Sequence, residues 1–137
     1  MTTASPTEGN DFVDTLIRFS LNHPVPEVAQ FAAETLGKIG DRRAVEPLIG
    51  VLEGTPEPGL AEAATEALGR LRDVRAVPIL SRMLERGALV VRVRAARALG
   101  EICGDEAVRA LLAARTDQNR VVRDAAQEAL QRCMAGS

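Results

Sequence analysis

Residues 32–37 read AAETLG, and the pattern returns as ATEALG at 64–69, AARALG at 95–100 and AAQEAL at 125–130. Measured at Leu36, Leu68, Leu99 and Leu130, the steps between copies are 32, 31 and 31 residues. A second segment recurs in the same register, as FVDTLIRFS at 12–20, AVEPLIGVL at 44–52, AVPILSRML at 76–84 and AVRALLAAR at 107–115. A fixed period carried by two different segments indicates a repeat protein.

Each repeat is predicted to be a pair of amphipathic helices. Apolar side chains recur at three- and four-residue spacing in both segments, as in a helix with one buried face. The pattern predicts an all-α fold of about eight helices without strands. We expect the helices near residues 11–21, 27–38, 43–53, 59–71, 75–86, 89–102, 106–115 and 120–134. The predicted core contains Val45, Leu48, Leu52, Leu68, Val77, Leu80, Leu84, Leu99, Leu111 and Leu130.

The turn between the two helices of a repeat has its own pattern. A Leu-Gly pair ends the first helix, and we expect its glycine to let the helices of the pair approach closely. These glycines are Gly37, Gly69 and Gly100. An aspartate follows, and an aspartate side chain can accept a hydrogen bond from the first N–H groups of the next helix. The predicted caps are Asp41, Asp73 and Asp105.

The pattern PEVxxxAAExLGxIGDxxAVEPLIxxLE resembles the HEAT-like repeats first described in phycobilisome (phycocyanobilin) lyase subunits. The resemblance covers roughly residues 12–134. It implies a right-handed α-solenoid whose second helices line a concave inner face. In the family an arginine follows the valine of the first helix, and here Arg92 and Arg123 keep it while Ala29 and Ala61 replace it. A ladder of arginines bound to loop aspartates is therefore expected only in the C-terminal half.

Length and composition indicate one soluble repeat domain. We expect residues 1–10 to be a disordered lead, residues 11–134 the repeat domain and residues 135–137 a tail. No run of eighteen apolar residues is present, and the first ten residues lack the features of a signal peptide. Cys103 and Cys133 have no metal-binding spacing, so we interpret them as free thiols in a reducing cytoplasm.

Catalytic chemistry is not predicted from the side chains. The chain has one histidine, His23, beside a proline in a loop. The HEAT-like hydroxylases, which have similar repeats, bind iron through several His-Glu pairs. Ser20 and Ser81 lie on helices without a nucleophile turn. The sequence therefore predicts a protein that is not an enzyme, with no catalytic residue, no metal site and no cofactor.

Charge is distributed unevenly along the chain. Residues 1–68 carry eleven acidic and four basic side chains, and residues 69–137 carry eight acidic and thirteen basic ones. The halves thus have net charges of −7 and +5 within an overall −2. Nucleic-acid binding through the basic half stays open as an alternative. The absence of Trp and Tyr disfavours it, because base stacking uses aromatic faces.

Protein recognition is the predicted function. A short solenoid exposes a surface whose residues are free to vary, because the buried stripes hold the fold. We expect an unidentified protein partner to bind the concave face as on a scaffold. The candidate partner-binding residues are Asp14, Arg18, Glu46, Glu53, Arg82, Glu85 and Arg109. A bilin-lyase-like chromophore chaperone subunit is the alternative from another class.

The two ends of the stack carry separate predictions. At the N-terminal end, all three phenylalanines, Phe12, Phe19 and Phe31, fall within the first three helices, and Phe12 and Phe19 are expected to cover an otherwise open core. At the C-terminal end, part of the apolar stripe of helix 120–134 is expected to pack on the third repeat, and the side meant for a partner helix is expected to lie bare. That side contains Ala126 and Leu130, and it gives a weak homodimer through this helix as one outcome.

Overall fold

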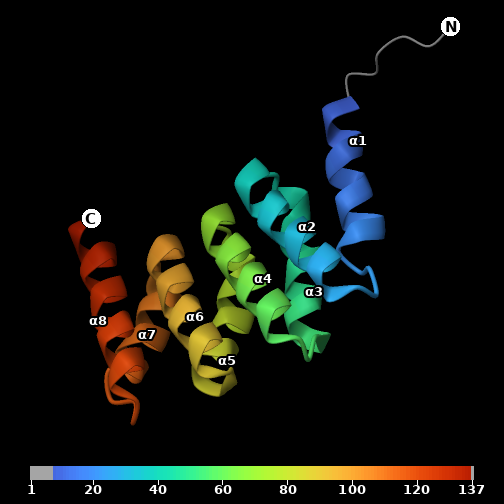
Figure 1. Cartoon of the computed structure of the whole chain (residues 1–137). Coiled ribbons are helices and arrows are strands. Elements are labelled where there is room, and N and C mark those ends of the chain that lie inside the picture. Colours follow the sequence, from blue (N-terminus) through green and yellow to red (C-terminus); the bar gives the residue numbers. More distant parts are fainter. Residues whose placement is uncertain (1–7, 137) are drawn as a thin grey trace, which may run out of the picture.

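A computed structural model describes residues 8–136, with the side chains described from Phe12 onward, and shows a two-layer stack of helices (Figure 1). The all-α solenoid expected from the sequence is confirmed, since residues 8–136 contain eight α-helices and no strand. The first helices are α2 (Pro26–Ile39), α4 (Pro58–Leu71), α6 (Leu89–Ile102) and α8 (Arg120–Ala135). The second helices are α1 (Glu8–Thr15), continued by the π-helical turn η1 (Leu16–Ser20), then α3 (Val45–Gly54), α5 (Val77–Arg86) and α7 (Asp105–Ala114).

The helix boundaries follow the prediction to within a few residues. Helix α1 begins at Glu8, inside the segment 1–10 that was expected to be disordered, and residues 1–7 lie outside the described part of the chain. Short 3-10 turns, η2 (Arg42–Ala44) and η3 (Val74–Ala76), precede α3 and α5. Proline opens α2 and α4, where the missing N–H group and the fixed φ angle fit the first helical turn.

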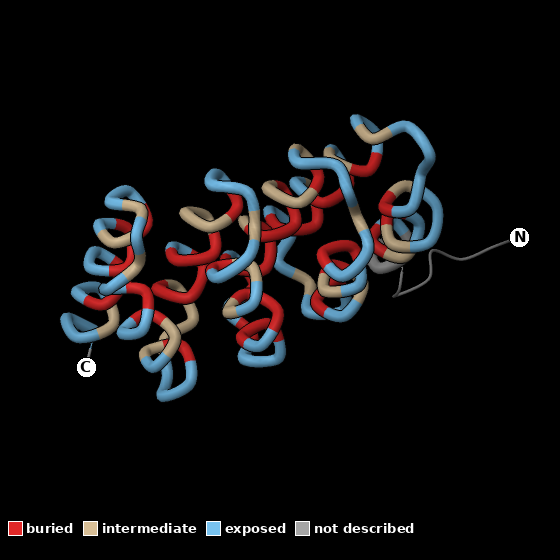
Figure 2. Tube along the Cα trace, turned by 90° about the horizontal axis from the view of Figure 1, so that it is seen from below, coloured by how far each residue is buried: buried red, intermediate tan, exposed pale blue. Residues whose placement is uncertain are grey.

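All ten predicted core residues are buried, and none is more than 6% exposed. Burial follows the inner sides of the two layers along the whole stack (Figure 2). Alanine and leucine dominate this core, which also contains one buried hydroxyl, that of Thr65. That hydroxyl donates to the carbonyl oxygen of Ala61 at 2.7 Å, so its burial leaves no unpaired polar atom.

The first helices pack backbone against backbone. A Cβ atom added to Gly37 would lie 2.8 Å from the Cα atom of Ala67, and Gly69 and Gly100 meet Ala98 and Ala129 in the same way at 2.9 Å. The expectation of a close approach at these glycines is confirmed, but the neighbour differs from the expected one. Each glycine contacts the first helix of the next repeat, because the second helix of its own repeat lies in the other layer.

The predicted aspartate caps are present in two repeats of three. Asp41 and Asp73 accept hydrogen bonds from the backbone N–H groups of Arg43 and Arg75, each at 2.9 Å. In the third repeat Gly104 occupies the capping position, and Asp105 is already the first residue of α7. The prediction for Asp105 was therefore wrong by one residue. Gly104 is the equivalent of Asp41, because it stands four residues after Gly100, as Asp41 stands four residues after Gly37.

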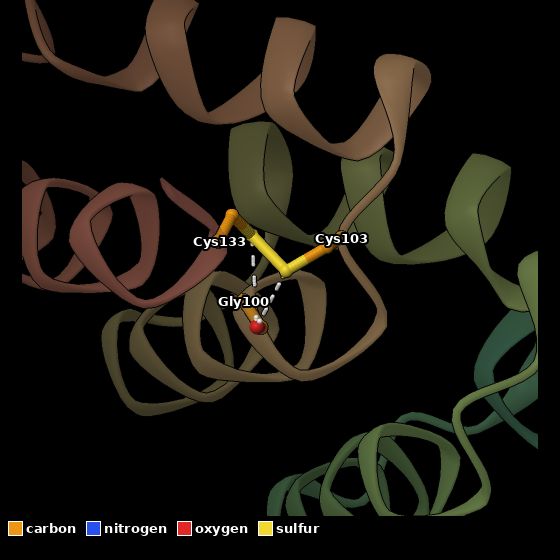
Figure 3. Close-up of a disulfide and its surroundings, with 3 residues drawn as sticks. All are labelled: Gly100, Cys103 and Cys133. Atoms are coloured by element: carbon orange, nitrogen blue, oxygen red, sulfur yellow. Dashed lines mark hydrogen bonds between the residues drawn. A yellow bond between two sulfur atoms is a disulfide. The ribbon is translucent and has the colours of Figure 1, made fainter. Parts of the chain in front are cut away.

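The two cysteines form a disulfide, which corrects the prediction of free thiols (Figure 3). Cys103 lies in the turn after α6 with a left-handed φ of 61°, and Cys133 lies in the last turns of α8. Their Cα atoms are 5.5 Å apart, and Cys103 Sγ lies 3.1 Å from the carbonyl oxygen of Gly100. The sequence separation is 30 residues, close to one repeat, and residues one repeat apart lie side by side in a stack.

The aromatic residues of the N-terminal end do not cover the core. Phe12, Phe19 and Phe31 are 54%, 68% and 64% exposed, so that prediction was wrong. The core under them is closed by smaller neighbours, Val13, Leu16 and Leu21, which are buried. The phenylalanine rings therefore form an outer surface.

The C-terminal end also differs from the prediction. Ala126 and Leu130 are 0% and 5% exposed, because the apolar side of α8 packs against α6 and α7. The outer side of α8 carries polar residues: Gln127 and Gln131 stand where α6 has Ala96 and Gly100. Of the predicted apolar stripe only Val121 is largely exposed, at 54%, so the homodimer through this helix stays a prediction with little of the surface that suggested it.

The glycine contact leads to the first testable prediction. Gly69→Ala should lower the free energy of unfolding by about 1–3 kcal/mol, because the new methyl group overlaps the α6 backbone at Ala98. Gly50→Ala is the matched control, since no atom lies within 4 Å of its added Cβ, and it should raise stability by about 0.5–1 kcal/mol. Urea denaturation measures both changes. Equal effects of the two substitutions would mean that the helices are not in close contact at Gly69.

The disulfide leads to the second prediction. Cys133→Ser should lower the free energy of unfolding of the oxidised protein by about 3–4 kcal/mol, the loop-closure estimate for the 30-residue separation. Reductant should lower the stability of the wild-type protein to that of the variant and leave the variant unchanged. Two titratable thiols in the non-reduced native protein would contradict the disulfide.

Candidate partner-binding surface

The seven candidate residues lie on the second-helix layer, but the structure does not bring them together as one site. Asp14 and Arg18 bind each other at 3.1 Å on α1 and η1. Glu46 lies 3.5 Å from Arg75 Nη1. Glu53, Arg82, Glu85 and Arg109 are exposed and make no ion pair within residues 12–136. The charges of Asp14, Arg18 and Glu46 are therefore already paired within the fold. The charges of the other four candidates are available to a partner.

A hollow of about 260 Å³ lies between α5 and α7 and includes one of the candidates, Glu85. Its floor is apolar, made by Leu84 together with alanines of α7. Polar groups stand around it, from Ser81, Glu85 and Asp117. Arg82 and Arg109 are not among its lining residues. The complete lining is Ser81, Leu84, Glu85, Ala110, Ala113, Ala114 and Asp117.

A second, polar hollow adjoins the first and shares Glu85 and Asp117 with it. It has a volume of about 450 Å³ and is otherwise lined by Arg92, Gln118 and Asn119. Together the two hollows make a continuous groove that is apolar between the helices and polar at the loop after α7. A groove of this kind can take an apolar side chain and a neighbouring polar one.

An arginine network holds the polar end of the groove in place. Arg92 donates to the carbonyl oxygen of Leu84 at 2.7 Å and forms an ion pair with Asp117. Arg123 donates to the carbonyl oxygen of Asp117, also at 2.7 Å. The N–H group of Asn119 donates to the Asp117 carboxylate, and this bond and Arg92 hold the pKa of that carboxyl below its ordinary value. Of the arginine ladder expected in the C-terminal half, Arg92 binds the carboxylate of a loop aspartate, whereas Arg123 binds only backbone carbonyl oxygens of the same loop.

A second charged cluster surrounds Asp73, whose side chain is 8% exposed. Arg75 donates to both of its carboxylate oxygens, with Nε at 3.0 Å and Nη2 at 2.8 Å. Arg42 from the preceding repeat approaches to 3.8 Å. The hydrogen bonds from the Arg75 side chain and backbone lower the pKa of Asp73 to about 2. All partners of this carboxylate belong to the fold, so the cluster stabilises the turn.

Sequence reasoning missed Ser81, Asp117 and Asn119. Asn119 was detectable, because an asparagine directly before a helical segment is a strong N-cap, and its side chain accepts from the N–H groups of Val121 and Val122. Ser81 and Asp117 had no such signal. They lie 36 residues apart in the chain, and only the packing of α5 beside α7 brings them to one hollow.

Comparison with known families gives a clear assignment. The family of HEAT repeats matches residues 13–92, more than half of the chain. This chain belongs to the HEAT repeat family. The PBS lyase HEAT-like repeat family matches residues 91–117, which contain α7 and the Arg92–Asp117 ion pair. No protein of established function matches the sequence in a search of the curated proteins.

Two similar solved structures extend the assignment. Human deoxyhypusine hydroxylase in complex with glycerol is 28% identical, with a TM-score of 0.80, over 90% of this chain and 43% of that chain. The complex of CpcE and CpcF of phycocyanin lyase from Nostoc sp. PCC7120 is 26% identical, with a TM-score of 0.75, over 98% of this chain and 55% of that chain. The HEAT-like repeat protein thus spans about half the length of the chains that it resembles.

These findings contradict the prediction that the protein is not an enzyme. Both similar structures are named for enzymes, a hydroxylase and a lyase, and the matching repeat family is named for a lyase. The prediction counted reactive side chains within one chain. That count is a poor guide for this family, because the similar lyase structure is a complex of two chains, and a site shared between chains is invisible in either sequence alone.

Neither a metal-binding cluster nor a membrane-spanning helix is found among the described residues. Residues 12–136 contain no cluster of three or more potential metal ligands, and His23 Nδ1 accepts a hydrogen bond from the N–H group of Val25 at 3.0 Å. An iron site built from several His-Glu pairs does not fit this chain. No helix in the described part is both long enough and apolar enough to span a membrane. The cytoplasmic location stays a prediction, and the disulfide removes one of its supports.

The cluster around Asp73 leads to a prediction about pH. Because its pKa is lowered from 3.8 to about 2, its stabilising effect is complete above pH 3.8 and is lost as pH falls through about 2. Asp73→Asn should lower the free energy of unfolding at pH 7 by about 1–3 kcal/mol, through the lost charge-assisted bonds. The difference from wild type should shrink between pH 4 and pH 2. Asp105→Asn is the control, because Asp105 makes no capping bond.

Denaturation at a series of pH values measures this difference. A constant gap between Asp73→Asn and the wild type down to pH 2 would show that the carboxylate charge does not contribute. A large effect of Asp105→Asn would show that helix N-termini in general, rather than the arginine contacts of Asp73, determine the pH dependence.

Proposed function

We propose that this HEAT-like repeat protein is the protein-binding subunit of a lyase-type or related enzyme assembly. In this proposal the partner inserts side chains into the groove between α5 and α7. The observation that carries it is the hollow of about 260 Å³ with an apolar floor and the unpaired carboxylate of Glu85 at its edge. The similarity to a two-chain lyase complex supports a protein partner.

The size and chemistry of the groove indicate what it would hold. Pockets for small molecules usually measure about 300–1,000 Å³, and this hollow of about 260 Å³ lies just below that range, with room for a side chain of a partner. The charge of Asp117 is already balanced by Arg92, whereas Glu85 has no ion-pair partner among residues 12–136. A partner segment with an apolar side chain next to a lysine or arginine fits both features. Arg82 and Arg109, on the same layer but outside the hollow, would steer the approach of an acidic neighbouring patch.

The proposal rests on this local groove and does not depend on the overall curvature of the stack. The first helices are the more closely packed layer, while the second helices touch each other only sparsely. A stack bends toward its closely spaced layer, so this packing does not support a concave second-helix layer. The groove lies between α5 and α7, where α7 contributes only small alanine side chains to the lining.

A bilin-lyase-like role is the second candidate, favoured by the match of the PBS lyase HEAT-like repeat to residues 91–117. These residues form half of the groove. In this case the chain would help to hold a linear tetrapyrrole together with a partner subunit. Mixing the full chain with phycocyanobilin and recording the absorption spectrum tests it, since a bound bilin shifts and sharpens its long-wavelength band.

The groove is tested on the partner that copurifies with the full chain from its native cells. Binding is then measured by calorimetry with the purified pair. Glu85→Lys and Ala113→Gln should each weaken binding about tenfold or more, the first by removing the charge partner and the second by filling the hollow. Both positions are at the protein surface, so the melting temperature should stay within about two degrees of wild type.

Glu53→Lys is the matched control, because Glu53 occupies the same helix position one repeat earlier and lines neither hollow. Unchanged affinity of this control, with weakened binding of the two groove variants, would support the proposal. Equal affinity of all four proteins would place the partner on another surface.

A further inference from the structure

The N-terminal end of the stack exposes positions that are buried in the later repeats. Phe12 corresponds in the repeat to Ala44, Ala76 and Ala107, which are all fully buried, yet Phe12 is 54% exposed. Phe19 corresponds to Val51, which is 8% exposed, and is itself 68% exposed. The later repeats each have a first helix ahead of these positions, and the described part of the first repeat has none.

The same contrast holds on α2. In α4, the stripe Gly59, Ala63 and Ala67 faces the preceding first helix, as the contacts of Gly59 with Gln30 and of Ala67 with Gly37 show. The corresponding stripe on α2 is Glu27, Phe31 and Thr35. Phe31 is 64% exposed where Ala63 is 4% exposed. Helices α1 and α2 therefore both present surfaces on which an additional first helix would pack.

The opposite end of the stack is built differently. Asp124, Gln127 and Gln131 are exposed on α8, at the positions that correspond to Val93, Ala96 and Gly100 of α6, where Gly100 meets Ala129 of the next first helix. A polar outer face is the usual way in which a repeat stack is closed. One end is thus closed by polar side chains, whereas the other carries three exposed phenylalanines.

Charge distinguishes between the molecules that could bind the N-terminal surface. Glu27 is exposed on the stripe itself, and residues 1–68 have a net charge of −7, so two copies meeting at this end would repel each other. The C-terminal helix of another copy exposes Val121 and Met134, but the stripe that would face Phe31 carries the polar residues Asp124, Gln127 and Gln131. A helix with an apolar stripe flanked by basic residues matches the surface in both respects. Within this chain Arg94 already pairs in this way with Glu62 of the preceding first helix, at 3.0 Å.

We propose that the N-terminal end of the stack is a docking site for a basic amphipathic helix of a different protein. The incoming helix takes the position that a first helix has ahead of each later second helix, covers Phe12, Phe19 and Phe31, and pairs a cation with Glu27. Because the α2 stripe has a phenylalanine where α4 has an alanine, this helix packs at a larger distance than neighbouring first helices do, with room for large apolar side chains. The site is separate from the groove between α5 and α7.

The probe for this site is a synthetic peptide with the sequence of residues 89–102, LVVRVRAARALGEI, a first helix with three arginines. A control peptide has glutamate in place of these arginines. Each peptide is titrated into the isotope-labelled full chain, and backbone amide shifts and binding heats are recorded. The basic peptide should shift amides of α1, η1 and α2 and bind more tightly than the acidic one.

Variants of the full chain make the test specific. Phe31→Gln should weaken binding of the basic peptide about tenfold. Glu27→Arg should weaken the basic peptide and strengthen the acidic one. Val121→Gln is the matched control, since Val121 is 54% exposed at the other end of the stack, and it should bind like wild type. Melting temperatures should stay unchanged, because all three side chains are at the surface.

Three outcomes would overturn the proposal. Shifts centred on the groove between α5 and α7, or equal binding by Phe31→Gln and wild type, would show that the helix docks elsewhere. Equal affinity for the two peptides would show that Glu27 does not contribute to recognition. Self-association of the chain that Phe31→Gln abolishes would identify a second copy as the occupant. None of these results bears on the groove variants, so the two proposals fail separately.

Discussion

The contact between a glycine of one first helix and an alanine of the next determines the spacing of the whole stack. At Gly37, Gly69 and Gly100 the two backbones are so close that even a methyl group has no room. Close packing of this kind maximises dispersion contacts between small side chains and explains a core made largely of alanine and leucine. It also leaves the second helices farther apart, and the groove between α5 and α7 is a consequence of that separation.

The ends of the stack have different chemistry because a repeat cannot bury its own outer face. At the C-terminal end, glutamine replaces the packing glycine, and a disulfide ties α8 to the turn after α6. At the N-terminal end, phenylalanine replaces the packing alanine and remains exposed. Charge follows the same direction, from an acidic first half to a basic second half. The molecule therefore offers a partner two distinct surfaces, one at the groove and one at the open end.

The similarity to a lyase and a hydroxylase changes how this surface chemistry is interpreted. Reactive side chains are sparse within this chain, but both similar chains are about twice as long as the part that matches, and one of them was solved as a two-chain complex. A reaction carried out by such an assembly requires correct placement of its parts as much as reactive groups on each part. Rigid elements such as the Arg92–Asp117 network are suited to that task.

The sequence by itself determined the eight helices, the ten core residues and the family, because a 31- or 32-residue period records the same local packing several times. It also contained one unused signal, the 30-residue separation of Cys103 and Cys133. The repeat pattern could not show which phenylalanines are exposed, since exposure depends on whether a neighbouring helix is present. The hollow beside Glu85 and the burial of Ala126 and Leu130 were decided by tertiary structure, whereas the pair of Asp14 and Arg18, four residues apart on one helical segment, follows from local spacing. The hollow depends on the distance between helices, which backbone contacts at three glycines establish.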